Sequence, residues 1–285
     1  MPARASTVFT PLILAALVLC LAPERAFADD IILPPVTVKT ERPPLLESYS
    51  SVTVIDVEAE DAAGKSVADL LETAPGVQIV RSGSMGQRET VTIRGSDSKQ
   101  VLVLIEGFYT TDPRAGGADL SQIPLDAVES IEIYRGAKGA LAGGSAMGGV
   151  VVVRLKKGGR KVSGTRRLTL GGYGGEGYES VSGAWSVQGG GAYFSYAHAQ
   201  AQGAYDYIDR NGNDRTRENN ASVSDLLTVT YGTRVAPATR LDLLGRMALT
   251  WRESPGLDQQ PSATAAEEQS NTFLIGAKLL AAQFP

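Results

Sequence analysis

Few side chains in this sequence have the types and spacing that chemistry requires. The chain contains one cysteine, Cys20, and one histidine, His198. No second histidine is available to build a metal site, so we interpret His198 as a packing residue or one that lines a lumen. The sequence also shows no nucleophile elbow and no Ser/His/Asp set at a recognisable spacing. We therefore expect no enzymatic activity.

One segment, YDYIDRNGNDRTREN, concentrates side-chain oxygens that a calcium ion could bind. The possible ligands are Asp206, Asp209, Asn211, Asn213 and Asp214. The segment lacks the glycine and the late glutamate that an EF-hand loop has at fixed positions. We therefore predict no resident metal or cofactor, with calcium at these residues as the alternative.

Two arginines occupy the same local context. Arg94 and Arg135 each stand directly before a glycine at the end of an apolar run. A guanidinium there would be partly buried and would need a carboxylate partner. The alternative is that both are solvated arginines at strand ends.

The elements that must position these arginines are short β-type runs bounded by glycine, at residues 90–95, 100–107, 128–136 and 148–155. Together they predict a small mixed sheet. The run 101–105 is apolar without alternation, which indicates a strand covered on both faces. Upstream, residues 51–56 alternate like a strand, and residues 66–80 predict a short amphipathic helix that leads into another strand.

The N-terminus resembles an export signal. Arg4 precedes an apolar run at residues 11–21, and Ala26-Phe27-Ala28 fits a cleavage site, so residues 1–28 are predicted to be removed, Cys20 among them. A transmembrane anchor and a lipoprotein signal ending at Cys20 are the alternatives. The net charge of −4 and a pI near 5.2 give no support for nucleic-acid binding.

Beyond residue 160 the chain is rich in glycine, tyrosine and serine and alternates in polarity. Strands are predicted near residues 166–174, 178–188, 191–201, 222–232, 239–251 and 271–281. In the fifth, Leu241, Leu243, Met247, Leu249 and Trp251 share one face, and Asp242, Arg246 and Thr250 share the other. Long connections, at 202–221 and 252–270, contrast with short ones at 189–190 and 233–238. This is typical of strands that cross an outer membrane between lipid and a wet lumen.

The ordered motifs IRG, VLVLIEG, ADLSQIPLDAVESIEIYRG and GGVVVV resemble the plug domain of TonB-dependent outer-membrane receptors, especially the cobalamin-type receptors. The resemblance covers about residues 33–153. Ala137, Ala142 and Val152 stand where the family usually has proline, tyrosine and asparagine.

The resemblance implies roles for three groups of residues. A TonB box, which adds a strand to TonB, would comprise Leu33, Pro34, Pro35, Val36, Thr37, Val38 and Lys39. Residues in two loops that face the ligand would be Ser84, Met85, Gln87, Tyr109, Asp112 and Arg114. Arg94 and Arg135 would lock the plug by pairing with glutamates on the inner barrel wall. On the residues alone, the first group is an ordinary linker and the loops are exposed turns.

The expected fold is an α+β plug domain followed by antiparallel transmembrane β-barrel strands, about 6 of the 22 that plugged barrels have. The expected segments are a signal peptide at 1–28, a flexible leader at 29–50, the plug at 51–160 and the N-terminal part of the barrel at 161–285. The implied function is TonB-dependent uptake of a cobalamin-type or iron-siderophore ligand at the cell outer membrane, by a chain expected to be part of a receptor. Its partners would be TonB, the ligand and outer-membrane lipid. The alternative is a non-transporting protein that binds TonB, or a remnant of a disrupted receptor gene.

Overall fold

The computed structural model describes residues 52–58, 64–110, 117–136, 146–158, 162–170, 177–187, 190–209, 211–217, 219–236, 238–254 and 266–281. The chain divides into two units, residues 1–42 and 43–285, and all described residues belong to the second. The predicted signal peptide and TonB box therefore lie outside the described residues. No helix in the described part has the length and apolar composition needed to cross a bilayer.

A five-stranded mixed sheet forms the centre of the N-terminal region, with the strand order β1-β6-β7-β4-β5. The strands are β1 (Val52–Asp56), β4 (Val101–Ile105), β5 (Phe108–Tyr109), β6 (Val128–Arg135) and β7 (Gly149–Leu155). The pair β4–β7 is parallel and the others are antiparallel. Four of the five residues of β4 are buried, as the unbroken apolar run predicted.

The first of the four predicted runs lies elsewhere, which corrects the expected sheet. Strand β3 (Glu89–Ile93) pairs with β2 (Val77–Arg81) in a separate two-stranded sheet. Arg94 and Gly95 follow β3 with φ of 52° and 76°, so the chain turns sharply before it can continue toward β4. The 3-10 helix η1 (Ser98–Gln100) then leads into β4.

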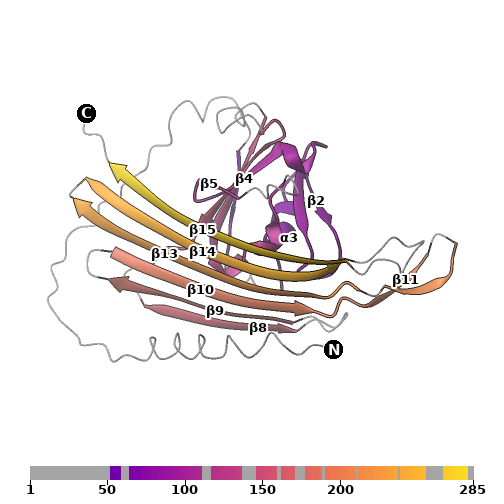
Figure 1. Ribbon diagram of the computed structural model, residues 1–285. Coiled ribbons are helices and arrows are strands. Elements are labelled where there is room, and N and C mark those ends of the chain that lie inside the picture. The colour runs from indigo at the N-terminus through magenta and orange to yellow at the C-terminus, as the bar shows by residue number, and fades with distance from the viewer. Residues whose placement is uncertain are drawn as a thin grey trace. The chain divides into compact units, whose positions relative to one another are not determined.

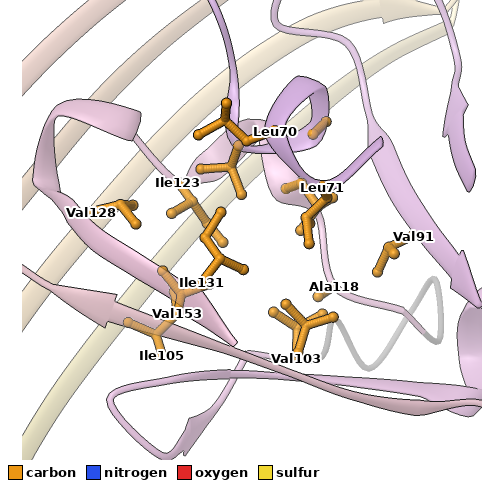
Figure 2. Packing of buried hydrophobic residues seen from close by; sticks show 14 of the residues in the cluster. Leu70, Leu71, Val91, Val103, Ile105, Ala118, Ile123, Val128, Ile131 and Val153 are labelled. Atoms are coloured by element: carbon orange, nitrogen blue, oxygen red, sulfur yellow. The ribbon is translucent and has the colours of Figure 1, made fainter. Parts of the chain in front are cut away.

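The predicted amphipathic helix is confirmed as α3 (Val67–Glu72), which begins at a capping box formed by Ser66 and Asp69. Figure 2 shows Leu70 and Leu71 of α3 in one cluster with Val91, Val103 and side chains of β6 and β7. This core lies between the five-stranded sheet and a layer made of α3, the β2–β3 pair and two 3-10 helices, η2 (Leu120–Gln122) and η3 (Leu125–Ala127). We call this region, residues 52–158 as described, the plug.

The remaining strands form one antiparallel sheet with the order β15-β14-β13-β10-β9-β8, which we call the wall (Figure 1). They are β8 (Ser163–Leu170), β9 (Gly177–Val187), β10 (Gly190–Ala201), β13 (Ser222–Ala236), β14 (Thr239–Ser254) and β15 (Ala266–Ala281). All six predicted strands are present. The last begins five residues earlier than predicted, because residues 266–270 pair with the end of β14 despite their polar sequence.

The two faces of the wall differ in chemistry. Alternate residues of β10, β13 and β14 are buried and mostly small or polar, whereas the opposite face exposes large apolar side chains. Those exposed on this outward face include Leu168, Val181, Trp185, Val229, Leu243, Phe273 and Ile275. A hairpin of β11 (Tyr205–Ile208) and β12 (Asp214–Arg217) extends from one end of the wall (Figure 1), which we call the hairpin end. The opposite end, where β13 turns into β14, is the turn end.

Candidate functional site: the contact between plug and wall

The polar loop between β2 and β3 is attached to the hairpin end of the wall. Gln87 is buried, and its side-chain amide donates to the carbonyls of Asn220, Ala221 and Glu253 at 3.2, 3.3 and 3.0 Å. Ser84 Oγ donates to the Asn220 carbonyl at 3.3 Å, and the carbonyl of Met85 accepts from Ser222 Oγ at 2.6 Å. Three of the six predicted ligand residues therefore lie together at this end, held by the wall.

Arg252 of β14 joins the same loop to the segment that begins at η2. Its Nε donates to the Gly86 carbonyl at 2.7 Å, and its Nη2 donates to Ser121 Oγ at 2.8 Å. The same Nη2 lies 2.7 Å from Asp119 Oδ2, and the two side chains are only 3% and 4% exposed. Asp119 Oδ2 has no aligned hydrogen bond within the described residues, so this contact is an ion pair without good hydrogen-bond geometry.

A second ion pair fixes η3 to the other side of the wall. Asp126, which is buried, accepts from Arg167 of β8, and its other carboxylate oxygen accepts from the Tyr178 hydroxyl of β9 at 2.8 Å. Tyr193 of β10 donates to the Asp126 carbonyl at 2.6 Å. Between the two ion pairs, Arg246 Nη2 donates to the Gln122 carbonyl at 2.7 Å. Four wall strands thus hold the segment 119–127.

A third charged cluster lies at the turn end. Glu106 is buried in a left-handed turn with φ of 52°, and its Oε2 lies 3.4 Å from Lys278 Nζ and 3.6 Å from Lys157 Nζ. Lys157 also lies 3.2 Å from Asp242 of β14. Lys278 stands over the ring of Phe108, 5.6 Å from its centre. Here the plug contributes the carboxylate of Glu106 and the cation of Lys157, and the wall contributes the cation of Lys278 and the carboxylate of Asp242.

The two predicted locking arginines differ in environment although each stands at the end of a strand and precedes a glycine. Arg94 is exposed, whereas Arg135 is 6% exposed and donates from Nη1 to Thr53 Oγ1 at 2.7 Å. Its Nε and Nη2 have no hydrogen-bond partner among the residues that the structure describes. Burial and the nearby Arg94 lower the pKa of Arg135. The expected burial is therefore wrong for Arg94, and the pairing of both arginines with wall glutamates stays a prediction.

The remaining predicted ligand residues are not brought to the Gln87 loop. Tyr109 is exposed on β5, next to Phe108, whose ring packs against Gly276 of β15 near the turn end. Gly276 lies opposite Leu244 of β14, and Gln87 contacts Glu253 of the same strand. At about 3.3 Å per residue along the strand, Tyr109 and the Gln87 loop are therefore roughly 30 Å apart. Asp112 and Arg114 lie outside the described residues.

The possible calcium ligands lie on the hairpin, where other groups use their oxygens. Asp209 accepts from the backbone N–H groups of Asn211 and Asn213, both at 2.9 Å, and from Arg215 Nε at 3.3 Å. These hydrogen bonds, chiefly that of the Asn213 backbone, lower the pKa of Asp209 to about 2. Within the described part of the chain, no three histidine, cysteine or acidic side chains come close enough to hold a metal ion.

Sequence reasoning missed the carboxylates of the plug and most of their partners in the wall. Arg246 was placed on the wet face of its strand, and the same alternation puts Arg252 there too. Asp119 caps η2 and Asp126 lies in the single turn of η3, and acidic residues are common at both kinds of position. Only the fold shows that these charges meet.

A charged network continues from Asp119 into the plug. Asp119 Oδ1 accepts from the Glu89 backbone N–H at 3.3 Å, and the Glu89 carboxylate lies 3.4 Å from Arg81 Nε. Arg81 also binds Asp69 and Glu72 of α3 at 2.7 and 2.9 Å. Burial raises the pKa of Glu89 to about 7, against the opposing effect of Arg81, because Arg81 is shared among three carboxylates.

A cavity of about 330 Å³ lies between this network and the wall. Its plug side includes Arg81, Glu89, Ser121 and Leu125, and its wall side includes Tyr178, Ala199 and Ser224. The site as a whole is a polar interface held by directional contacts around one cavity. It contains no arrangement of a nucleophile and a base among the described residues.

Comparison with known proteins identifies the plug. Residues 44–150 match the family model described as TonB-dependent Receptor Plug Domain. Residues 44–150 form a plug domain of the TonB-dependent receptor type. Its relatives include the vitamin B12 transporter BtuB of Photobacterium profundum, which is 37% identical over 188 residues, 64% of this chain and 29% of that protein. BtuB of Vibrio vulnificus is 35% identical over 145 residues, 51% of this chain and 22% of that protein.

The chain therefore spans less than a third of the length of these curated relatives, and it is similar to the cobalamin-type members of the receptor family. Two solved structures share its fold. The copper transporter OprC is 22% identical with a TM-score of 0.56, over 72% of this chain and 31% of that one. A mutant of the ferric enterobactin receptor PfeA from Pseudomonas aeruginosa is 19% identical with a TM-score of 0.58, over 79% of this chain and 38% of that one. The expected fold class, a plug followed by antiparallel barrel strands, is confirmed.

Proposed function

We propose that this chain is part of an outer-membrane receptor that takes up a cobalamin-type ligand with energy delivered through TonB. The observation that carries the proposal is a TonB-dependent receptor plug seated on the polar face of a sheet whose outward face exposes leucine, valine, phenylalanine and isoleucine. Such an apolar face suits lipid, and a polar inner face suits a wet lumen. Similarity to vitamin B12 transporters favours cobalamin over an iron siderophore as the ligand.

The predicted site residues take roles within this proposal. The segment Leu33–Lys39 would add a strand to TonB, since its central VTV is β-prone and flanked by prolines that prevent a regular internal ladder. The loop of Ser84, Met85 and Gln87 would face the ligand, because it lies at the hairpin end beside the long connections. Arg135, with two buried nitrogens unpaired among the described residues, would pair with a carboxylate from a part of the receptor outside them.

Uptake of radiolabelled cyanocobalamin tests the proposal. Cells that lack their own cobalamin receptor would express this receptor from its gene, with and without functional TonB. We expect uptake only with TonB, and receptor in the outer-membrane fraction. Val36→Pro should abolish uptake and leave binding to the cell surface intact, because proline removes a backbone donor from the added strand. Thr40→Ala, just beyond the segment, is the control and should leave uptake unchanged.

Two results would overturn this assignment. Uptake at the same rate without TonB would exclude energy coupling through the leader. Growth supported by a ferric siderophore, without binding of cyanocobalamin, would show that the ligand is a siderophore. TonB-dependent uptake would then still stand. A receptor that binds TonB in pull-down but takes up neither compound would be the non-transporting protein of the alternative reading.

A further inference from the structure

Three rows of β10 and β13 present different chemistry to the plug, and an apolar row of Ala197 and Leu226 lies between the first and the second. At the hairpin end, Ala199 pairs with Ser224, and both line the cavity of about 330 Å³. Further along, Ser195 pairs with Thr228. Closest to the turn end, Tyr193 pairs with Thr230. The first two rows carry only small side chains, and the third begins with a large one.

The two rows of small side chains contain buried polar atoms that have no hydrogen-bond partner among the described residues. The hydroxyls of Ser195, Ser224 and Thr228 are at most 2% exposed and have no hydrogen-bond partner among the described residues. Arg246, which pairs with Thr228 across β13 and β14, has an unpartnered Nε in the same row. An unsatisfied buried polar group costs roughly 1–3 kcal/mol. Several in one row indicate a place that water or a polar solute solvates.

The third row closes this place toward the turn end. The Tyr193 hydroxyl donates to the Asp126 carbonyl, and Thr230 Oγ1 donates to the Lys156 carbonyl at 2.8 Å. Tyr193 is also part of the core cluster of the plug. The Asp126 carboxylate, bound by Arg167 and Tyr178, holds η3 against the wall beside it. Three of these closing contacts, from Arg167, Tyr178 and Tyr193, converge on Asp126.

The other side of the cavity is fixed more firmly. Arg252 binds Asp119, Ser121 and Gly86 at once, and Arg246 binds the Gln122 carbonyl. An opening between η2 and β14 would break all of these contacts. An opening between η3 and the strands β9, β10 and β13 needs the release of the Asp126 carboxylate from Arg167 and Tyr178 and of the Tyr193 hydroxyl from the Asp126 carbonyl. It uncovers the hydroxyls of Ser195, Ser224 and Thr228.

We propose that the seam between η3 and strands β9, β10 and β13 is the passage for a polar ligand, and that Asp126 is the latch that closes it. The seam would take neutral groups rich in hydrogen-bond acceptors, such as amides, since its free donors are hydroxyls and one guanidinium and it lacks a wall carboxylate among the described residues. That the seam is a passage rests on the proposed uptake function. That Asp126 holds the seam closed does not depend on that function.

Cysteine labelling tests the latch without any ligand. The given sequence has a single cysteine, Cys20, in the predicted signal peptide, and labelling of the receptor without an introduced cysteine gives the background. Thr228→Cys in the receptor should react slowly with a small charged thiol reagent added to intact cells. Adding Asp126→Ala should speed the reaction about tenfold or more, since it removes the charge-assisted hydrogen bonds from Arg167 and Tyr178, and the loss of even one such bond accounts for about tenfold. Tyr178→Phe, which removes one donor only, should have a smaller effect in the same direction.

Val103→Cys in the plug core, 1% exposed, is the matched control and should stay protected in the Asp126→Ala background. Faster labelling of Thr228→Cys alone supports the latch. Faster labelling at both positions means that the plug unfolds, and unchanged labelling at Thr228→Cys means that Asp126 does not hold the seam. Either result overturns the proposal.

A second comparison tests the passage. Ala199→Trp fills the cavity and should lower cyanocobalamin uptake at least tenfold while surface binding persists. Ala277→Trp, on the outward face opposite Leu243, should leave uptake unchanged. Equal uptake by the two variants would refute the passage. Absence of uptake by the unmodified receptor would refute the proposed function instead, and the labelling result would still decide the latch.

Discussion

Replacing Arg252 with methionine should loosen the plug at η2 more than any change to an exposed ion pair of the wall. The side chains of Arg252 and Asp119 are 3% and 4% exposed, so neither charge has water as a substitute partner. Breaking a buried ion pair by removing one member costs about 3–5 kcal/mol. The variant also loses the hydrogen bonds from Arg252 to Gly86 and Ser121.

The lower end of that range applies here. Asp119 Oδ1 keeps three donors after the substitution, namely the backbone N–H and the hydroxyl of Ser121 and the backbone N–H of Glu89. The Arg252–Asp119 contact is also poorly aligned as a hydrogen bond. We expect a loss of about 3 kcal/mol, which corresponds to an opening constant about 100-fold larger.

Hydrogen–deuterium exchange of the peptide that covers residues 117–123, measured on the detergent-solubilised receptor, reports this opening directly. Its amides should exchange about 100-fold faster in Arg252→Met. The control is Arg240→Met on the same strand, because Arg240 lies 2.6 Å from Asp242 but is 47% exposed. A pair of that kind contributes about 0–1 kcal/mol. Equal effects of the two variants would refute the reasoning from burial.

Three further predictions concern the plug itself. Burial raises the pKa of Glu89 from 4.5 to about 7, so the folded state keeps a proton that the unfolded chain loses. The free energy of unfolding should therefore fall by about 2 kcal/mol between pH 5 and 8. Denaturant titrations should show a flatter pH dependence for Glu89→Gln. Gly149→Ala should destabilise the plug by about 3 kcal/mol, since φ is 146° and a Cβ would lie 2.7 Å from the Tyr134 carbonyl oxygen, whereas Gly95→Ala meets no atom within 4 Å and should cost about 1 kcal/mol in the same titration. Leu71→Ala, at a fully buried position, should lower stability by about 2–5 kcal/mol, and a smaller loss would mean that the core around α3 is loosely packed.

Local sequence was enough where the structure depends on local rules. The run 101–105 forms a buried strand, because a strand that is apolar on both faces is stable only when both faces are covered. The helix at Val67–Glu72 begins at Ser66 because its side chain and that of Asp69 satisfy each other's backbone N–H groups. Both outcomes follow from residues only a few positions apart.

The sequence was not enough where the outcome depends on which segments meet. Arg94 and Arg135 both stand at the end of an apolar run and precede a glycine, yet one is exposed at a turn and the other is buried beside Thr53. The run at residues 90–95 has strand character, but the sequence does not reveal that its partner is β2 rather than β4. The ion pairs of Asp119 and Asp126 join residues 133 and 41 positions apart, and no spacing rule connects them.

The charges at the interface explain how a plug can be held firmly and still be released. At three ionic contacts the plug supplies the carboxylate, through Glu106, Asp119 or Asp126, and the wall supplies a cation, whereas the pair of Lys157 and Asp242 has the opposite arrangement. Among the described residues, the wall adds Tyr193 and Leu244 as buried members of the plug's apolar core and Ala184 and Leu274 at its margin, so most of the core comes from the plug itself. Directional polar contacts are lost one at a time, and water replaces each of them at little net cost, whereas a shared apolar core would have to be exposed at once. We infer that the contacts between plug and wall can break while the plug core stays packed. Substitutions in the core should therefore affect folding of the plug, and substitutions at the three carboxylates should affect its release from the wall.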